Sequence, residues 1–163
     1  MIEIKPIDDT SRGWAWRSFL QWWAAPFVVS NEKRLYFEDM PGVVAFLNGK
    51  PSGLLTYNII GAEFEVVTIN SSVPNRGIGR ALMTAAVDEA KKRKCTKIWL
   101  TTTNANINAL RFYQRVGMRV GVWRIGKMEE ARRLKPEIPL EQDGIPIRDE
   151  VVLELDLDQR PEV

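Results

Sequence analysis

The chain has 163 residues, of which 45% are hydrophobic and 27% are charged, and its formal net charge is +2. This length and composition predict one folded domain, residues 1–163, and argue against a chain that is disordered throughout. The near-neutral charge gives no reason to expect a nucleic-acid or membrane partner, and no apolar stretch reaches the ~20 residues of a membrane helix. Because the N-terminus also lacks a signal-peptide pattern, we expect a cytoplasmic protein.

Two residue types limit the chemistry that the protein can perform. Histidine is absent, which rules out Ser-His-Asp and Cys-His catalysis and any zinc site built on histidine. Acid–base work must therefore fall to Glu, Asp, Tyr, Lys, Cys or water, and we expect no metal site. The single cysteine, Cys95, cannot form an intramolecular disulfide and is interpreted as a packed thiol.

The first part of the chain predicts one helix and an antiparallel meander. The expected elements are a strand at residues 2–7, a helix at 10–24, and strands at 43–47, 53–59 and 63–69. Thr10 or Ser11 is the expected N-cap of the helix, and Pro26 ends it. Asn48-Gly49 is the strongest short signal for a hairpin turn. Alternation in the last strand predicts two opposite faces, one with Glu63, Glu65, Val67 and Ile69 and the other with Phe64, Val66 and Thr68.

The second part of the chain alternates helices and strands. Helices are expected at residues 78–93, 106–116 and 127–134, and strands at 97–103, 119–125 and 150–157, with a tail at 158–163 that is expected to fray. A strand, a helix and another strand in succession predict a crossover that makes one parallel strand pair. No linker divides this pattern into two domains.

The segment Asn75-Arg76-Gly77-Ile78-Gly79-Arg80 lies between a predicted strand and a predicted helix. Glycines allow a ligand to approach the backbone, and free N–H groups at a helix N-terminus bind phosphates. The two arginines can add charge-assisted hydrogen bonds. Neither the Walker A pattern nor the dinucleotide-binding fingerprint is present. From this segment alone, a tight turn with two solvated arginines explains the pattern equally well.

A second motif follows at residues 106–117, NINALRFYQRVG. The pairing of GIGRALM with N-x-x-A-x-x-x-Y-x-x-x-G resembles the GNAT superfamily of N-acetyltransferases, over roughly residues 1–125. The closing part of the chain, KPEIPLEQDGIPIRDEVVLELDL, resembles the end of an uncharacterised bacterial subgroup. Proteins of that subgroup look similar across the whole chain, including the segments MPG at 40–42 and GLLTY at 53–57. The resemblance implies an α/β (α+β) fold of the GNAT acyl-CoA N-acyltransferase type, with a mixed, mostly antiparallel sheet flanked by helices.

The resemblance also implies an acetyl-CoA site. The loop and helix start would hold the CoA pyrophosphate, although Pro74 replaces the usual Gln or Arg of the family pattern. The pantetheine arm would lie between two splayed strands and pair with the backbone near Val67, Thr68 and Ile69. Asn106 matches the family Asn near the CoA arm, and Tyr113 matches the frequent general acid. The implied cofactor-binding residues are Val67, Thr68, Ile69, Asn75, Arg76, Gly77, Ile78, Gly79, Arg80 and Asn106.

The general base is a separate question. Some family members use a Glu early in the strand that here reads KIWLTTT, where this chain has Thr101. We expect Glu65, on the cofactor strand, to act as base through a water, with Glu63 as second choice and an ordered water chain as a third possibility. Each residue also has a structural interpretation: Tyr113 as core, Glu65 as a solvated strand residue, and Asn106 as a helix N-cap.

The sequence therefore predicts an enzyme that moves an acetyl group from acetyl-CoA to a primary amine of a small molecule, with a homodimer possible. Two alternatives keep the same fold: a protein acetyltransferase acting on an N-terminus or lysine, and a non-catalytic acetyl-CoA sensor. A nucleotide- or nucleic-acid-binding module using Arg76 and Arg80 is a third. The acidic side chains that can line a pocket for a cationic acceptor are Glu141, Asp143, Asp149 and Glu150.

Overall fold

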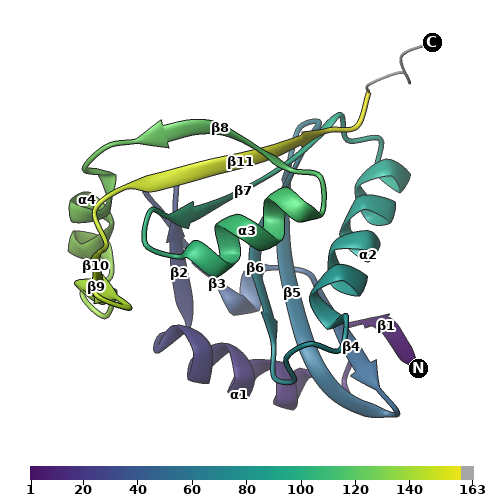
Figure 1. The fold of residues 1–163 in the computed structure, drawn as a ribbon. Coiled ribbons are helices and arrows are strands. Elements are labelled where there is room, and N and C mark those ends of the chain that lie inside the picture. Colours follow the sequence, from purple (N-terminus) through teal and green to yellow (C-terminus); the bar gives the residue numbers. More distant parts are fainter. Residues whose placement is uncertain (159–163) are drawn as a thin grey trace.

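The computed structural model describes residues 1–158, so the tail that is expected to fray at 158–163 lies almost wholly outside the described residues. Figure 1 shows a twisted central sheet with helices packed against it. The helices are α1 (Arg12–Trp23), α2 (Ile78–Lys92), α3 (Ile107–Arg115) and α4 (Lys127–Leu134), with a short 3-10 helix η1 (Phe37–Asp39). Within residues 1–158, no helix combines the length and apolar character needed to cross a membrane.

Seven strands form the main sheet, in the order β1-β4-β5-β6-β7-β11-β8. They are β1 (Ile2–Pro6), β4 (Gly42–Leu47), β5 (Lys50–Ile60), β6 (Glu63–Ser71), β7 (Lys97–Thr103), β8 (Arg119–Arg124) and β11 (Glu150–Asp156). All neighbours are antiparallel except β6 and β7, which are parallel. The expected mixed, mostly antiparallel sheet and its one parallel pair are thus confirmed, and the expected strands differ from these bounds only at their ends.

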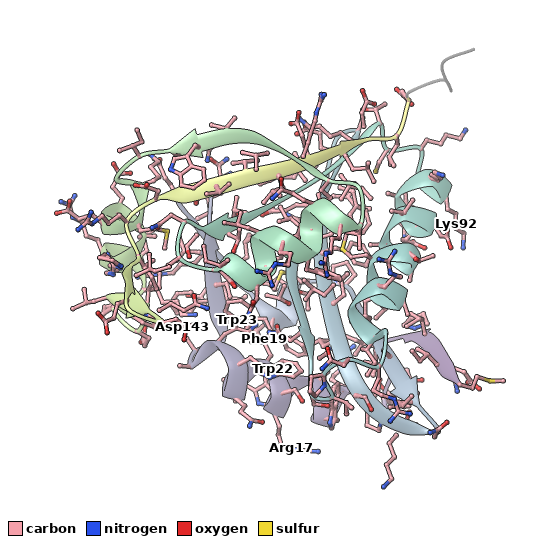
Figure 2. The ribbon with its side chains drawn as sticks, in the orientation of Figure 1. Arg17, Phe19, Trp22, Trp23, Lys92 and Asp143 are labelled. Carbon is pink, nitrogen blue, oxygen red and sulfur yellow. The ribbon has the colours of Figure 1, made fainter. Side chains whose placement is uncertain are left out.

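The two faces of the sheet carry separate cores. On one face α2 and α3 cover a cluster that includes Leu55, Phe64 and Leu82. On the other face α1 covers a cluster that includes Phe19 and Leu54. Figure 2 labels Phe19, which is fully buried, on the side of α1 that faces the sheet. Consecutive residues Leu54 and Leu55 enter opposite cores because side chains of a strand alternate between its faces.

Turn chemistry explains the meander. Asn48 and Gly49 both have positive φ, 51° and 82°, as a two-residue hairpin turn of the primed type requires, and β4 and β5 pair on either side of them.

At α1 the expected cap is only partly right. Ser11 holds the N-cap position but makes no side-chain cap, and Asp8 instead accepts the N–H groups of Thr10 and Ser11 through its carboxylate.

Two small hairpins have no counterpart among the predicted elements. β2 (Phe27–Ser30) pairs with β3 (Lys33–Tyr36), and β9 (Glu141–Gln142) pairs with β10 (Ile145–Pro146). The first reverses direction through Asn31 and Glu32, both at positive φ. Glu32 is not a usual residue for that conformation, so the turn carries no clear sequence signal. These hairpins matter because they build one side of the site.

Candidate active site

The central feature of the site is a split between β6 and β7. These parallel strands pair only from Glu63–Glu65 to Lys97–Trp99. Beyond that point β6 stays paired with β5 as far as Ser71, and β7 stays paired with β11 as far as Thr103. The two strands therefore diverge toward their C-terminal ends, and backbone groups of Val67 to Ile69 face an opening in the sheet instead of a neighbouring strand.

A bulge lies in β6 at the start of this split. The register against β5 shifts between Thr56↔Thr68 and Tyr57↔Val66, so Val67 is the extra residue. The expected alternation is therefore wrong beyond the bulge. Glu65 and Val67 share the α1 face as predicted, because Glu65 contacts β2 and Val67 packs in the α1 cluster. Ile69, predicted on that same face, packs instead against the α2 cluster.

The loop from Asn75 to Arg80 begins α2 as the sequence predicts. Asn75 and Gly77 have positive φ, 59° and 77°, and Gly77 is the N-cap with no side-chain cap. The first helical hydrogen bond runs from Ala81 N to Gly77 O, so the N–H groups of the first turn are directed out of the helix end. Arg76 and Arg80 are exposed, and a Cβ placed on Gly77 meets nothing within 4 Å. This end has the form of an anion-binding helix terminus.

Gly79 has a different role from Gly77. A Cβ at Gly79 would approach the ring of Phe112 to 3.1 Å, so the absence of a side chain allows α2 and α3 to pack closely. Ile78, between them, is buried and belongs to the α2 core. Of the predicted loop residues, these two hold the helix start in place, while Asn75, Gly77 and the two arginines form its open surface.

The second motif supplies α3. Asn106 is its N-cap, and its side-chain oxygen accepts a 3.2 Å hydrogen bond from Ala109 N. Tyr113 is 9% exposed and packs in the core between α3, α2 and the sheet. Burial raises the pKa of Tyr113 above its ordinary value of 10, and among residues 1–158 its hydroxyl has no hydrogen-bond partner. The structural interpretations of both residues therefore hold.

A cavity of about 470 Å³, here called the main cavity, opens beside the split. Val67 of β6 and Thr101, Thr102 and Thr103 of β7 line it, so both diverging strands contribute to its wall. Asn106 joins them from the start of α3. The remaining wall comes from Trp22, Trp23 and Ala24 at the end of α1, Val28–Ser30 of β2, Met128 and Ala131 of α4, Lys135, Glu137–Pro139, Glu141, Gln142, Ile147 and Glu150.

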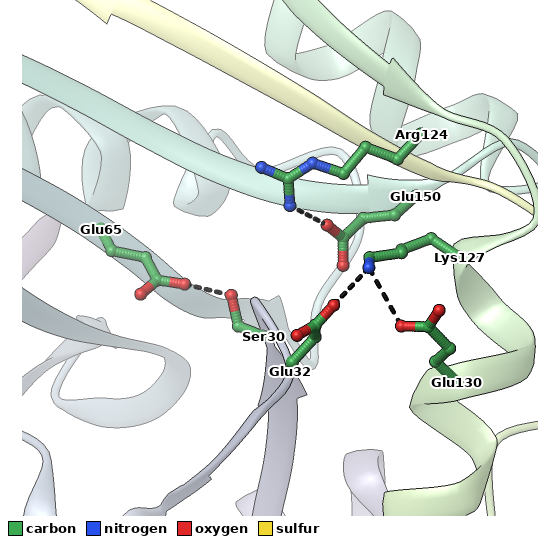
Figure 3. Close-up of polar contacts among 7 residues, drawn as sticks. All are labelled: Ser30, Glu32, Glu65, Arg124, Lys127, Glu130 and Glu150. Carbon is green, nitrogen blue, oxygen red and sulfur yellow. Dashed lines mark hydrogen bonds and ion pairs between the residues drawn. The ribbon is translucent and has the colours of Figure 1, made fainter.

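Glu65 contacts the wall of the main cavity through Ser30. The Ser30 hydroxyl donates a 2.5 Å hydrogen bond to Glu65 Oε2, and the Glu65 side chain is 4% exposed (Figure 3). Burial raises the pKa of Glu65, the Ser30 bond lowers it, and the nearby Glu150 carboxylate raises it further. The alternative interpretation of Glu65 as a solvated strand residue is therefore wrong. Glu63 is exposed and pairs with Lys97 at 3.0 Å, which leaves it poorly suited to act as a base.

A second buried carboxylate, Glu150, borders the main cavity at the start of β11. Its Oε1 accepts a 2.7 Å charge-assisted hydrogen bond from Arg124 Nη1 (Figure 3). Glu141 also lines the cavity, as predicted for a cationic acceptor. The two aspartates in that predicted set do not. Asp149 accepts from Trp123 Nε1 and Gly126 N, and Asp143 occupies the turn between β9 and β10 (Figure 2).

The sequence matches the model of the Acetyltransferase (GNAT) family over residues 10–118. The chain belongs to the GNAT acetyltransferase family. The uncharacterised protein YdhI of Bacillus subtilis is 34% identical over 154 residues, which cover 93% of this chain and 96% of YdhI. The resemblance that the two motifs carry is thus confirmed.

Solved structures with the same fold support the GNAT architecture. A Bacillus subtilis acetyltransferase in complex with CoA has a TM-score of 0.70 and 22% identity, over 96% of this chain and 97% of that chain. A GNAT family acetyltransferase from Elizabethkingia anophelis with acetyl-CoA bound has a TM-score of 0.72 and 18% identity, over 96% and 98% of the two chains. At this identity the likeness concerns the fold.

Three contributors to the site escape sequence reasoning. Ser30 lies in the unpredicted hairpin β2–β3, and its partner Glu65 is 35 residues away. Lys135 directly follows α4, a position at which a lysine is ordinarily exposed to solvent, yet Lys135 is 4% exposed. Arg124 is recognisable only through Glu150, which it meets because β8 and β11 pair in register. No local pattern marks any of them, since each depends on a contact between distant segments.

Proposed function

We propose that this protein transfers an acetyl group from acetyl-CoA to the primary amine of a small molecule. The single observation that carries the proposal is the split between β6 and β7, whose two strands both border the main cavity. A donor lying in the split would present its thioester beside the cavity that receives the acceptor. The family membership supports the same reaction class.

The donor would be held by backbone and helix-end groups. The first turn of α2 offers N–H groups and a positive dipole to the pyrophosphate, and Arg76 and Arg80 add charge. The pantetheine amides would pair with the free backbone of β6 at Val67, Thr68 and Ile69. Asn106, which caps α3 with its side-chain oxygen, keeps its amide N–H₂ as a donor toward the cofactor arm.

The acceptor amine must lose a proton before it attacks, because alkyl amines titrate near the lysine value of about 10. We assign this proton to Glu65, through a water, with Ser30 orienting the carboxylate. The amine nitrogen then bonds to the thioester carbon, and a β6 backbone N–H near Val67 stabilises the oxyanion. When the C–S bond breaks, Tyr113 donates its hydroxyl proton to the CoA thiolate, and the nitrogen loses its second proton through water, which reprotonates Tyr113.

The main cavity supports a small acceptor. Its volume of about 470 Å³ lies within the range of about 300–1,000 Å³ that is usual for small-molecule sites. Glu137–Pro139, Glu141 and Gln142 form part of its wall together with residues of α1, β2 and α4, so the acceptor would contact several elements. This volume favours a small molecule as the acceptor, and the protein acetyltransferase remains the second candidate.

Calorimetric titration with acetyl-CoA, free CoA and ATP tests the donor, and thiol release from acetyl-CoA in the presence of amines tests the reaction. We expect micromolar binding of acetyl-CoA and CoA, no comparable binding of ATP, and amine-dependent thiol release. Binding without release for any amine or peptide would favour the sensor alternative. The absence of binding by either CoA species would refute the proposal altogether.

A further inference from the structure

Lys135 is a buried cation in the wall of the main cavity. It follows the last residue of α4, and its side chain is 4% exposed. Its Nζ donates a 3.0 Å hydrogen bond to Phe27 O of β2. The same Nζ lies 5.8 Å from the ring centroid of Trp23 and 5.7 Å from that of Phe27, within the range of cation–π contacts.

Nothing within residues 1–158 balances this charge at close range. No carboxylate of the described chain lies within 4.0 Å of Lys135 Nζ. Burial lowers the pKa of Lys135, and the exposed Glu137 raises it by a smaller amount. A buried charge without a counterion is costly, so proteins retain one mainly where a ligand or a function requires it.

The ammonium also has unused hydrogen-bonding capacity. A lysine ammonium has three N–H donors, and among residues 1–158 only Phe27 O engages one of them. A carboxylate in the main cavity would accept the remaining donors and supply the missing negative charge. The CoA pyrophosphate cannot be this anion, because its proposed site is the α2 start, and residues 75–80 do not line the cavity.

The main cavity also contains a group that suits an amine. Glu150 is 7% exposed, and its Oε1 is held by Arg124 at 2.7 Å, while its Oε2 has no partner among the described residues. The wall of one cavity therefore contains a buried ammonium and a buried carboxylate. Apolar side chains, including Trp22, Met128 and Ile147, form much of the wall between polar groups. This combination complements a small zwitterion with an apolar body.

We propose that the acceptor is a small molecule that carries a carboxylate as well as its primary amine, as amino acids do, and that Lys135 binds the carboxylate. The inference rests on the proposed acetyl transfer, because the amine of this molecule would be the acetylated group. Lys135 would then be a specificity-determining residue that selects an amino acid over the corresponding simple amine.

The test compares each amino acid with its decarboxylated amine. Thermal shift of the CoA-saturated protein identifies which of the twenty standard amino acids bind. Calorimetry then measures the preferred one, for instance phenylalanine, against its amine, here 2-phenylethylamine. We expect the wild type to bind the amino acid about 10- to 100-fold more tightly, as a charge-assisted contact provides. O-phosphoethanolamine against ethanolamine tests whether a phosphate is preferred instead.

The variants separate recognition from structure. Lys135→Met should abolish the preference by weakening amino-acid binding and leaving amine binding unchanged. Lys135→Gln, which keeps a donor for Phe27 O but not the charge, should behave in the same way. Arg133→Met is the matched control, because it removes a positive charge from the exposed surface of α4, outside the main cavity. It should retain the full preference, and all three variants should bind CoA normally.

The outcomes are distinguishable. If no standard amino acid binds, or if Lys135→Met and Lys135→Gln retain the preference, the inference is overturned. A Lys135-dependent preference confined to the phosphate pair would overturn its assignment to a carboxylate. Because the readout is binding to the CoA complex, it does not depend on acetyl transfer. Lys135-dependent binding without thiol release from acetyl-CoA would refute the proposed catalysis and leave the recognition of the acid intact.

Discussion

Ser30 Oγ and Glu65 Oε2 are joined by a 2.5 Å hydrogen bond that links the β2–β3 hairpin to the strand at the split. Both residues are buried, at 5% and 4% exposure. The bond satisfies one carboxylate oxygen and leaves the other available. A small hairpin absent from the predicted elements therefore orients the carboxylate that we assign as the general base.

Replacement of Glu65 should remove the base. For Glu65→Gln we expect kcat/KM to fall about 100-fold or more at neutral pH, because the amide cannot accept the amine proton. The acid limb of the pH–rate profile should disappear at the same time. Glu63→Gln is the control on the same strand, since it alters only an exposed pair with Lys97, and it should change kcat/KM less than about twofold. Equal losses in both variants would contradict the assignment.

Glu65 should also affect stability in a pH-dependent way. Its pKa in the folded protein is raised above the ordinary value of 4.5, mainly by burial, so the folded state favours the protonated form. Ionisation of Glu65 therefore does not affect the free energy of unfolding below the ordinary pKa. As the pH rises through the raised pKa, ionisation lowers the free energy of unfolding progressively. We expect the thermal midpoint of Glu65→Gln to exceed that of the wild type most at pH 8, with the difference shrinking toward pH 4. A pH-independent difference would show that ionisation of Glu65 has no part in it.

Loss of the Ser30 hydroxyl should shift the same titration. The Ser30 bond lowers the pKa of Glu65, so Ser30→Ala should raise that pKa further. The acid limb of the pH–rate profile should move to higher pH, with a moderate loss of rate at neutral pH and full recovery in more alkaline buffer. Ser18→Ala is a matched control, because Ser18 is a buried serine of α1 that does not line the main cavity. An unshifted acid limb in Ser30→Ala would argue against Glu65 as the base.

Tyr113→Phe tests the general acid. We expect kcat to fall about 100-fold, because the leaving thiolate loses its proton donor, while the phenyl ring preserves core packing. Burial raises the pKa of Tyr113 well above its ordinary value, so its hydroxyl stays protonated throughout the assay range and cannot produce an alkaline limb. Tyr57→Phe, in the same core and stacked on Phe64, should leave kcat unchanged. A fully active Tyr113→Phe would restrict Tyr113 to a structural role.

Two glycines with positive φ allow the effect of backbone strain to be separated from the effect on cofactor binding. Gly77 and Gly61 have φ of 77° and 60°, and a Cβ on either meets nothing within 4 Å. Alanine at each position should therefore cost about 1–2 kcal/mol of stability. Only Gly77→Ala should weaken acetyl-CoA binding, by about tenfold or more in calorimetry, since its methyl group would enter the space proposed for the pyrophosphate. Equal affinities in the two variants would place the pyrophosphate elsewhere.

Local chemistry explains what the sequence by itself determined. The Asn48-Gly49 turn, the glycine loop before α2 and the Asn106 cap depend on residues a few positions apart, so their patterns are visible in the chain. Hydrophobic periodicity similarly predicts the meander and the helices. The GNAT family was indicated separately, by the resemblance that the pairing of the glycine loop with the Asn106–Gly117 motif carries.

The tertiary structure alone decided how the site is built. The bulge at Val67 reverses the expected side of Ile69, because an inserted residue changes the alternation that a sequence pattern assumes. Lys135 contacts Phe27 across 108 positions of the chain, and Glu65 contacts Ser30 across 35. Burial of these two charged groups, and hence the shifts of their pKa values, arises only when distant segments pack together, and no local propensity encodes it.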